Sequence, residues 1–460
     1  MITNANQDIS GQGSGSSAIP SHGISWRAAL AVWCKVAALS FGGPTGQIAM
    51  MHRILVDEKR WISDSRFLHA LNYCMLLPGP EAQQLATYIG WLLHGTRGGL
   101  VAGVLFILPG AAAILALSML YVEFYDTGFV QALFYGLKPA VVAVVVEAVL
   151  RIGKRVLKNG AMVLLAAAAF GALFFFGVSF PIVIAAAGVI GWLGGRWRED
   201  VFYVLKPKQP EAGKDSPPAE YAITDDVARA PHTQTSGWKT LRVAGIWLLL
   251  WLGPLGILAW RLGTEHVLVK EGVFFSKAAV VTFGGAYSVL GYVKQEAVEK
   301  QEWLSAGEML DGLGMAETTP GPLIMVVQFV GFLGAYRDPG ALPPLVSGLL
   351  GSLVTTWGTF APCFLWIFTG APYIEKLRGN KTLSTALSAI TAAVVGVVLN
   401  LAVWFAWQTL IVRPANTLDL AAVVLCLAAS LAILRFHVNM LVTLGTSAVL
   451  GATYYMLFMT

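Results

Sequence analysis

Charged residues are scarce in this sequence. They make up 12% of its 460 residues, whereas hydrophobic residues make up 56%. A soluble globular protein carries about 25% charged residues, so this chain has too few charges to cover a water-facing surface. The scarcity excludes a soluble fold of this length and makes lipid the solvent for most of the side chains.

Cysteine is also rare, and its four occurrences lie far apart. No Cys-x-x-Cys pair occurs, which argues against a cysteine-bound metal or a redox-active dithiol. The net charge of +5 is not concentrated in a basic face, which argues against a nucleic-acid partner. We therefore expect no cofactor, no metal and four apolar membrane thiols, which are Cys34, Cys74, Cys363 and Cys426.

The sequence has instead many apolar runs that are long enough to cross a bilayer. A hydrocarbon core of ~30 Å requires about 20 apolar residues in a helix. The pattern predicts an all-α polytopic membrane protein with about 13 transmembrane helices. Clear runs of this kind are Leu100–Leu120, Val130–Leu150, Leu383–Trp407 and Leu418–Leu434.

A polar stretch between Gly194 and Trp238 interrupts these apolar runs. Its lysines and prolines are typical of a soluble linker. The first 25 residues are rich in Ser, Gly and Asn and lack the regions of a cleavable signal peptide. We therefore divide the chain into a disordered tail (1–25), an N-terminal membrane repeat (26–193), a cytoplasmic linker (194–240), a connecting transmembrane helix (241–261) and a C-terminal membrane repeat (262–460).

The two membrane halves carry the same motifs in the same register. A lysine, a Phe-Gly-Gly motif, a tryptophan and a Pro-Gly-Pro motif each recur 242 residues later. Such a match over a long ungapped window indicates an internal duplication. The matching residues are Lys35, Ser40, Phe41, Gly42, Gly43, Trp61, Pro78, Gly79 and Pro80 in the first half, and Lys277, Thr282, Phe283, Gly284, Gly285, Trp303, Pro320, Gly321 and Pro322 in the second.

The charges of the loops predict that the two repeats have opposite orientations. The basic cluster 151–158 follows the fourth predicted span of the first half, so the positive-inside rule makes it cytoplasmic. The loop before that span is acidic, whereas its counterpart at 376–381 is basic. A loop whose sign flips between copies is typical of an inverted repeat. This scheme puts the N-terminus inside, the C-terminus outside and the segment Met50–Arg66 outside, unless that segment is an interfacial helix.

Each repeat has two motifs that interrupt a helix. Phe-Gly-Gly provides a flexible backbone, and Pro-Gly-Pro removes amide donors and stops a helix. Within hydrocarbon, free backbone groups are tolerated only where protein buries them or where they line a cavity. Paired interruptions at matching places therefore predict broken or re-entrant helices around a substrate site. Their helix N-termini suit an anion, although a turn outside the membrane would explain one motif equally well.

Lys35 and Lys277 each lie six positions before a Phe-Gly-Gly motif, within an apolar stretch. A lysine within a span costs at least ~2.5–3.5 kcal/mol on insertion scales. Two symmetric ammonium groups would neutralise one dianion, so we expect both lysines to bind substrate. The alternative is that each side chain extends to the membrane interface.

Further polar side chains flank the Pro-Gly-Pro motifs. The amides of Gln83 and Gln84 are candidate donors to an oxyanion, as is the hydroxyl of Thr319. Thr319 suits helix capping equally well. These three residues join both lysines and the motif residues in the predicted substrate site.

Glu81 and Glu147 are candidates for proton coupling because both lie in apolar surroundings. Glu81 would also stabilise the first turn of a helix that begins after Pro-Gly-Pro. Glu147 lies four residues before Arg151, a spacing at which a helix-end ion pair forms. Both alternatives stay open.

These residues together resemble the chromate ion transporter family in its long two-domain form. The resemblance covers both membrane halves, roughly 26–193 and 272–457. It rests on Lys35, Ser40-Phe41-Gly42-Gly43-Pro44, Trp61, the stretches 77–86 and 106–110, Phe283-Gly284-Gly285, and Thr319-Pro320-Gly321-Pro322.

The resemblance implies a secondary transporter rather than an enzyme. It implies that chromate leaves the cytoplasm by alternating access across the plasma (bacterial inner) membrane, which gives chromate resistance, and that sulfate competes. Two alternatives remain: a transporter of another anion, such as sulfate, and a membrane enzyme that reduces chromate with a bound cofactor. The sequence leaves open whether the chain acts alone or as a homodimer.

Overall fold

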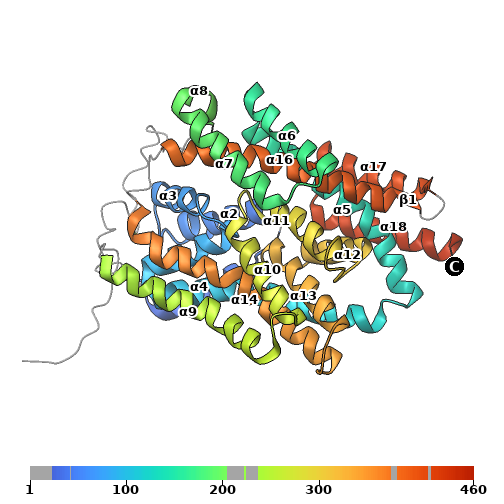
Figure 1. Ribbon diagram of the computed structural model, residues 1–460, viewed down its shortest axis with the longest axis horizontal. Helices are drawn as coiled ribbons and strands as arrows, with labels where there is room; N and C mark the ends of the chain where they lie inside the picture. The colour runs from blue at the N-terminus through green and yellow to red at the C-terminus, as the bar shows by residue number, and fades with distance from the viewer. Residues whose placement is uncertain are drawn as a thin grey trace, which may run out of the picture.

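The computed structural model describes residues 23–41, 43–204, 222–223, 237–374, 381–412 and 416–459. Within these ranges the chain is almost entirely helical (Figure 1), and seven helices are long and apolar enough to cross a membrane. The predicted all-α polytopic class is confirmed. The described strands, β1 (Ile411–Val412) and β2 (Thr417–Leu418), pair antiparallel, with Ile411 opposite Leu418.

The first half consists of eight α-helices and one π-helix within the described residues. They are α1 (Trp26–Ala38), α2 (Gly43–His52), the π-helix η1 (Arg53–Glu58), α3 (Asp64–Cys74), α4 (Glu81–Phe124), α5 (Gly128–Val156), α6 (Gly160–Phe176), α7 (Phe180–Trp197) and the short α8 (Glu199–Phe202).

The second half follows the connecting helix α9 (Gly237–Leu262). Its elements are α10 (Val267–Val281), α11 (Ala286–Val293), the π-helix η3 (Lys294–Val298), α12 (Ala306–Thr318), the 3-10 helix η4 (Leu323–Met325), α13 (Val326–Arg337), α14 (Pro344–Gly370), the 3-10 helix η5 (Ala371–Tyr373), α16 (Lys381–Leu410), α17 (Leu420–Leu434) and α18 (Met440–Phe458).

The backbone repeats in local detail as well as in sequence. Arg60 has a φ of 53° and Glu302, its match 242 residues later, a φ of 52°. A π-helix precedes each of them. The side chain of Ser63 caps α3 and that of Ser305 caps α12, each by accepting from the amide three residues on. The duplication therefore preserves positive-φ residues and caps, features that sequence similarity alone does not guarantee.

The predicted spans do not each correspond to one helix. The chain around the first Pro-Gly-Pro motif is not one span but α3 followed, after the motif, by the start of α4. The predicted run Leu100–Leu120 lies inside α4, which bends sharply at His94 and Gly95. The bend presses two glycines together: a Cβ on Gly90 would lie 2.5 Å from the Gly98 carbonyl oxygen. Short broken helices therefore replace several of the expected continuous spans.

Corresponding helices of the two halves run in opposite directions. We call the side that carries residues 199–204 and 222–223 the linker face. Asn159, after the end of α5, donates to the Val201 carbonyl at 2.8 Å, and Lys381, at the start of α16, lies 2.7 Å from Glu199. At the other end of α5, Tyr135 contacts Asp419, which follows α16. Helix α5 thus ends at the linker face, whereas α16 begins there.

The two halves are interleaved rather than set side by side. Helix α16 packs against α5, α6 and α7, and α17 and α18 pack against α5 (Figure 1). Gly136 of α5 and Gly451 of α18 touch through their backbones, so these helices approach as closely as small residues allow. One hydrophobic core spans both halves.

The predicted position of the segment 50–66 is wrong relative to the linker. Linker residue Ile223 is buried and forms a bridge with Ile62, and its carbonyl accepts from the Ser63 amide at 3.0 Å. Two segments that share backbone hydrogen bonds lie on the same face. If the linker is cytoplasmic, this segment is cytoplasmic too, because it returns to the face from which the linker leaves.

Most of the linker and of the N-terminal tail lies outside the described residues, as do the basic residues Lys376 and Arg378 used in the topology argument. The division of the chain into five parts stays a prediction.

Candidate functional site

The chain breaks predicted from the sequence meet in the structure. We call the meeting point the motif crossing and define it as residues 40, 41, 43, 78–80, 282–285 and 320–322. The Gly79 amide donates to the Thr282 carbonyl at 2.9 Å, and the Gly321 amide donates to the Ser40 carbonyl at 2.6 Å. Thr282 and Gly321 match Ser40 and Gly79 in the repeat, so each half gives the other the same bond. Such reciprocity is what a two-fold relation between copies produces.

The helices break at both motifs, as the sequence predicts. Helix α1 ends before Ser40 and α2 begins at Gly43, while α10 ends before Thr282 and α11 begins after Gly285. Both Pro-Gly-Pro motifs likewise lie between helices. Re-entry of these helices within a bilayer stays a prediction, and Gly42 lies outside the described residues.

The central glycines of the Pro-Gly-Pro motifs fit the crossing for two reasons. Gly79 has a φ of 116° and Gly321 a φ of 102°, which L-residues rarely adopt. A Cβ on Gly79 would lie 2.8 Å from the Cys363 sulfur, and one on Gly321 would lie 2.8 Å from the Gly110 Cα. Because the flanking prolines have no amide hydrogen, the glycine amide is the one donor each motif has for the opposite half.

Four helical segments begin at the crossing. Helix α2 begins at Gly43, α11 after Gly285, α4 after Pro80, and η4, which continues into α13, after Pro322. The first amides of a helix lack intrahelical partners and carry a partial positive charge. The crossing therefore concentrates unpaired amide donors, the arrangement that protein folds use to bind oxyanions.

Buried amide side chains surround these helix starts. Gln47 donates to the carbonyls of Gly321 at 2.7 Å and Ser40 at 3.4 Å. Gln84 donates to the Pro78 carbonyl at 2.7 Å, and Gln83 to the Thr87 hydroxyl at 3.0 Å. The predicted donors Gln83 and Gln84 are thus already bonded to protein. Among the described residues, the side-chain oxygens of Ser40, Gln47, Gln83 and Gln84 are buried without a partner.

Unpaired buried oxygens of this kind cost about 1–3 kcal/mol each in an ordinary core. The three glutamine oxygens accept hydrogen bonds, so water and not an oxyanion would complete theirs, whereas the Ser40 hydroxyl can donate to an anion. The Ser40 hydroxyl stands out because it is fully buried and its hydrogen is free to donate.

The threonines of the second half bond to their own helices. Thr319 donates to the Ala316 carbonyl at 3.4 Å, and Thr282 donates to the Ala278 carbonyl at 2.6 Å. These contacts correspond to the local alternative for Thr319 that the sequence allowed. A role in substrate binding would require the hydroxyls to rotate away from these carbonyls.

Both predicted lysines lie on helix surfaces. The contacts described below for Lys35 and Lys277 are with residues outside the motif crossing. Lys35 forms a 2.9 Å ion pair with Glu58, and both side chains are largely exposed. This hydrogen bond lowers the pKa of the Glu58 carboxyl. Lys277 lines an apolar groove of about 630 Å³ between α9 and α10, beside Trp251 and Tyr292. The structure does not bring the lysines together, and their role in substrate binding stays a prediction.

A charged cluster approaches the crossing from the end of α5. Glu147 and Arg151 form an ion pair at 3.5 Å. Their charges act on a buried pair in which Tyr287 of α11 donates to Glu317 of α12, two residues before Thr319. The ion pair that the sequence allowed for Glu147 is therefore observed. Its partner Arg151 lies near the linker-face end of α5, and its charge reaches Glu317, which precedes the second Pro-Gly-Pro motif.

Arg155 plays the matching part at the first Pro-Gly-Pro motif. Its guanidinium lies 3.2 Å from the sulfur of Met75, which follows α3, and its charge acts on Glu81. Glu81 occupies the first turn of α4. The charges of two arginines from one helix thus reach carboxyl groups next to the two Pro-Gly-Pro motifs, Arg155 at the first and Arg151 at the second.

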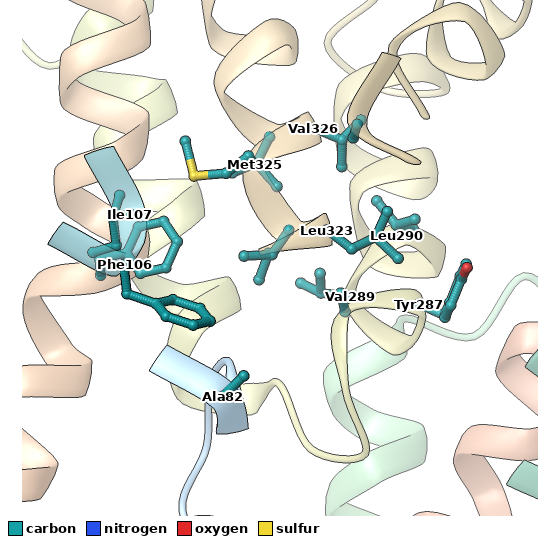
Figure 2. Close-up of a cluster of buried hydrophobic side chains, with 14 of the residues drawn as sticks. Ala82, Phe106, Ile107, Tyr287, Val289, Leu290, Leu323, Met325 and Val326 are labelled. Atoms are coloured by element: carbon teal, nitrogen blue, oxygen red, sulfur yellow. The ribbon is translucent and has the colours of Figure 1, made fainter. Parts of the chain in front are cut away.

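Apolar side chains form a wall beside the crossing (Figure 2). Ala82 and Leu323, just beyond the two Pro-Gly-Pro motifs, face a common cluster with Phe106 of α4 and Val289 of α11. The Tyr287 hydroxyl is directed away from this cluster. Such apolar surroundings exclude water and strengthen electrostatic contacts with a bound ion.

Sequence reasoning missed Gln47, Tyr287 and the part played by Arg151 and Arg155. Gln47 is the one amide in an otherwise small or apolar stretch after Phe-Gly-Gly, a signal that was available. In the sequence the basic cluster marks the cytoplasmic side, and Arg151 is also a possible ion-pair partner of Glu147, but the sequence does not show that α5 leads back to the motifs.

Comparison with known proteins gives consistent matches over both halves. A family model described as chromate transporter matches residues 27–192 and 270–452. The chromate transport protein of Pseudomonas aeruginosa is 32% identical over 381 residues, which cover 82% of this chain and 80% of that protein.

Two further relatives align over a similar extent. The chromate transport protein of Cupriavidus metallidurans is 28% identical over 396 residues, 85% of this chain and 86% of that protein. A probable chromate transport protein of Synechococcus elongatus is 26% identical over 390 residues, 85% and 87%. No solved structure matches the chain.

Proposed function

This chain belongs to the chromate transporter family, and from that membership we propose that it exports chromate from the cytoplasm by alternating access. Chromate resistance of the cell is the expected outcome. The observation that carries the site of this proposal is the motif crossing, where two reciprocal backbone bonds join four helix starts.

The crossing has the chemistry that a tetrahedral dianion requires. The first amides of the helix starts and the Ser40 hydroxyl provide donors, and the apolar wall keeps water from competing for them. Arg151 and Arg155 attract the ion on its approach from the linker face.

The opposite directions of the two halves favour alternating access. In transporters with inverted repeats, each half takes in turn the conformation that the other has just left, so a site between them faces the two sides alternately. The sharp bend of α4 at His94 and Gly95, and the breaks at the motifs, are the places where such a change concentrates.

Export needs no ATP. A dianion that leaves a negative-inside cell gains about 2.3 kcal/mol per charge per 100 mV, or roughly 4.6 kcal/mol in total. At about 1.36 kcal/mol per decade, this gain supports a gradient on the order of 10³.

The first test is a flux assay in energised everted vesicles that contain the full chain. We expect these vesicles to accumulate radiolabelled chromate when the interior is made positive, and we expect sulfate to compete. Vesicles with a correctly inserted chain and no chromate accumulation would refute export. Imposing the potential and the pH gradient separately shows which of them drives the flux.

The second candidate function is transport of another oxyanion, with sulfate as the leading case. Sulfate has the charge and shape of chromate, so the donors of the crossing do not separate the two ions. Sulfate flux at least about ten times the chromate flux at equal concentration, a preference of about 1.4 kcal/mol, would favour this candidate.

The lysines are tested by substitution. Lys35 and Lys277 belong to the half-helices that end at the crossing, and we propose that they neutralise the ion during part of the cycle. We expect Lys35→Ala and Lys277→Ala each to lower chromate flux at least about tenfold, a loss of about 1.4 kcal/mol, without loss of folded protein. Lys270→Ala, on the same helix as Lys277 but paired with the exposed Glu265, is the matched control. Unchanged flux in both test variants would show that the lysines do not bind the ion and would favour the alternative, in which each side chain extends to the membrane interface.

A further inference from the structure

A buried ion pair joins the two halves away from the motif crossing. Lys138 of α5 lies 3.3 Å from Asp311 of α12, measured from Nζ to Oδ1. Tyr121 of α4 donates to the other carboxylate oxygen at 2.9 Å. The Asp311 side chain is fully buried, whereas 23% of the Lys138 side chain is exposed. One half supplies the lysine and the tyrosine, and the other supplies the carboxylate.

The pair lies toward the face opposite the linker. Lys138 precedes Arg151 by 13 residues of α5, about 20 Å at the helical rise, and Arg151 is near the linker-face end. Asp311 precedes Glu317 by six residues of α12, about 9 Å. Helix α12 therefore carries three buried carboxyl groups, Glu308, Asp311 and Glu317, from its far-face end to the second Pro-Gly-Pro motif. The course of α12 is seen in Figure 1.

The charged and titratable groups around Asp311 are few. Just beyond the end of α4, the Tyr125 ring lies tilted against that of Tyr121, with ring centroids 4.5 Å apart. On α12 itself, Glu308 is bound by Arg337 of α13, so that guanidinium is already paired. Lys138 is thus the cation that faces Asp311 directly.

The other elements that pack on α12 bring charges that are paired with one another or bonded elsewhere. On η3, Lys294 pairs with Glu299 and Glu296 pairs with Lys300. The tyrosines at the end of α18 contact Tyr135 and Gln131 of α5. Within the described residues, Asp311 has no second cationic partner that would hold it charged once Lys138 moves.

Packing alone does not explain this pair. Replacing a buried ion pair with apolar groups of similar size is often neutral or stabilising, so the pair is weak evidence for stability. An ionisable residue inside a membrane protein is a functional candidate for that reason. A buried carboxylate beside one movable, partly exposed ammonium is suited to binding a proton that enters from the far face.

We propose that Asp311 is a proton-binding site that couples proton entry from the face opposite the linker to outward movement of the oxyanion. This inference rests on the proposed function. Hydronium at the far face gives up the proton: one O–H bond breaks in hydronium, one forms on the Asp311 carboxylate, and water and a neutral acid remain. Lys138 then loses its counter-ion, and the lock between α5 and α12 opens. Release of the proton on the linker side restores the carboxylate and the lock.

The experiment compares Asp311→Asn with the wild-type chain in proteoliposomes, in two assays. One measures net chromate flux driven by a pH gradient, and the other measures exchange of labelled for unlabelled chromate without a gradient. We expect the substitution to lower net flux at least about tenfold and to remove its dependence on the gradient, while exchange stays within about twofold. Exchange requires conformational change but no net proton movement, so a merely structural role would lower both.

Three variants complete the design. Asp311→Glu keeps a carboxyl group and should restore gradient dependence. The double variant Lys138→Gln/Asp311→Asn leaves no buried unpaired charge, and it replaces the single variant if that does not fold. Glu265→Gln, an exposed carboxylate that precedes α10, should behave as wild type.

Gradient-driven net flux that persists in Asp311→Asn, or equal loss of exchange and net flux in folded protein, overturns the inference. Failure of the proposed function looks different, because the wild-type chain would then move no chromate in either assay. Wild-type flux that ignores the pH gradient removes the coupling site and leaves chromate transport intact.

Discussion

Replacing Gly321 with alanine is expected to abolish chromate flux, by at least about a hundredfold, and to lower the yield of folded protein. A non-glycine residue at a φ of 102° costs about 1–3 kcal/mol. The new Cβ would also lie 2.8 Å from the Gly110 Cα, a backbone atom that cannot rotate away. The two effects together should lengthen the hydrogen bond that the Gly321 amide donates to the Ser40 carbonyl.

The matched variant in the first half should be milder. A Cβ on Gly79 meets the Cys363 sulfur and the Gln84 amide, which are side-chain atoms. Gly79→Ala combined with Cys363→Ala should therefore recover part of the flux, whereas no side-chain change relieves Gly321→Ala. Gly245→Ala, in open space on α9, is the control and should match wild type. The measurements are size-exclusion profiles in detergent and flux in everted vesicles, and wild-type flux in Gly321→Ala would contradict the crossing as the site.

Arg151→Gln is expected to lower chromate flux at least about tenfold at low substrate concentration, chiefly by raising KM. Arg151 is the cation that offsets Glu147 and acts on Glu317. Without it, two carboxyl groups face an arriving dianion. Like charges at roughly 6 Å repel by on the order of 1–3 kcal/mol at an effective dielectric constant of 80 to 20.

Charge and not shape should decide this result. Arg151→Lys keeps the positive charge, so its KM should stay within about threefold of wild type. A tenfold change would correspond to about 1.4 kcal/mol. The double variant Glu147→Gln/Arg151→Gln should recover part of the loss. Arg196→Gln removes a guanidinium that lies 4.1 Å above the Trp192 ring at the linker-face end of α7, and it should leave KM unchanged. Equal KM values in Arg151→Gln and wild type would exclude the arginine from the approach route.

Sequence reasoning predicted the features that depend on local chemistry. Helix breaks at Phe41–Gly43 and at both Pro-Gly-Pro motifs follow from the missing amide donors and the flexible backbone, and the structure breaks its helices there. The duplication was equally readable, because matching residues keep one offset. The same reasoning did not reveal that each broken motif bonds to the other kind of motif in the opposite half.

What the sequence did not reveal depends on tertiary packing. Lys35 and Lys277 have a symmetric position in the sequence, but Lys35 has Glu58 within reach and the matching position in the second half is Lys300. The duplication kept the lysines and not their partners. The segment 50–66 was placed on the wrong face relative to the linker because charge counts do not show where a short broken helix turns back.

The burial of Asp311 and Glu317 was hidden for a related reason. Both stand in a stretch with ordinary helix formers and a Ser-x-x-Glu capping box, which suggests a solvated helix start. Only the packing of α12 between α4, α5 and α13 buries their carboxyl groups.

The reciprocal bonds at the motif crossing make the two halves mechanically interdependent. In each half, a glycine amide donates to a backbone carbonyl beside the broken helix of the other half. Both bonds join backbone groups, so no flexible side chain absorbs a displacement at either junction. A shift of one half that stretches the bond from the Gly79 amide also stretches the bond from the Gly321 amide, because the two bonds are related by symmetry. Under the proposed alternating access, we therefore expect both junctions to change shape together, which disfavours a form open to both sides at once.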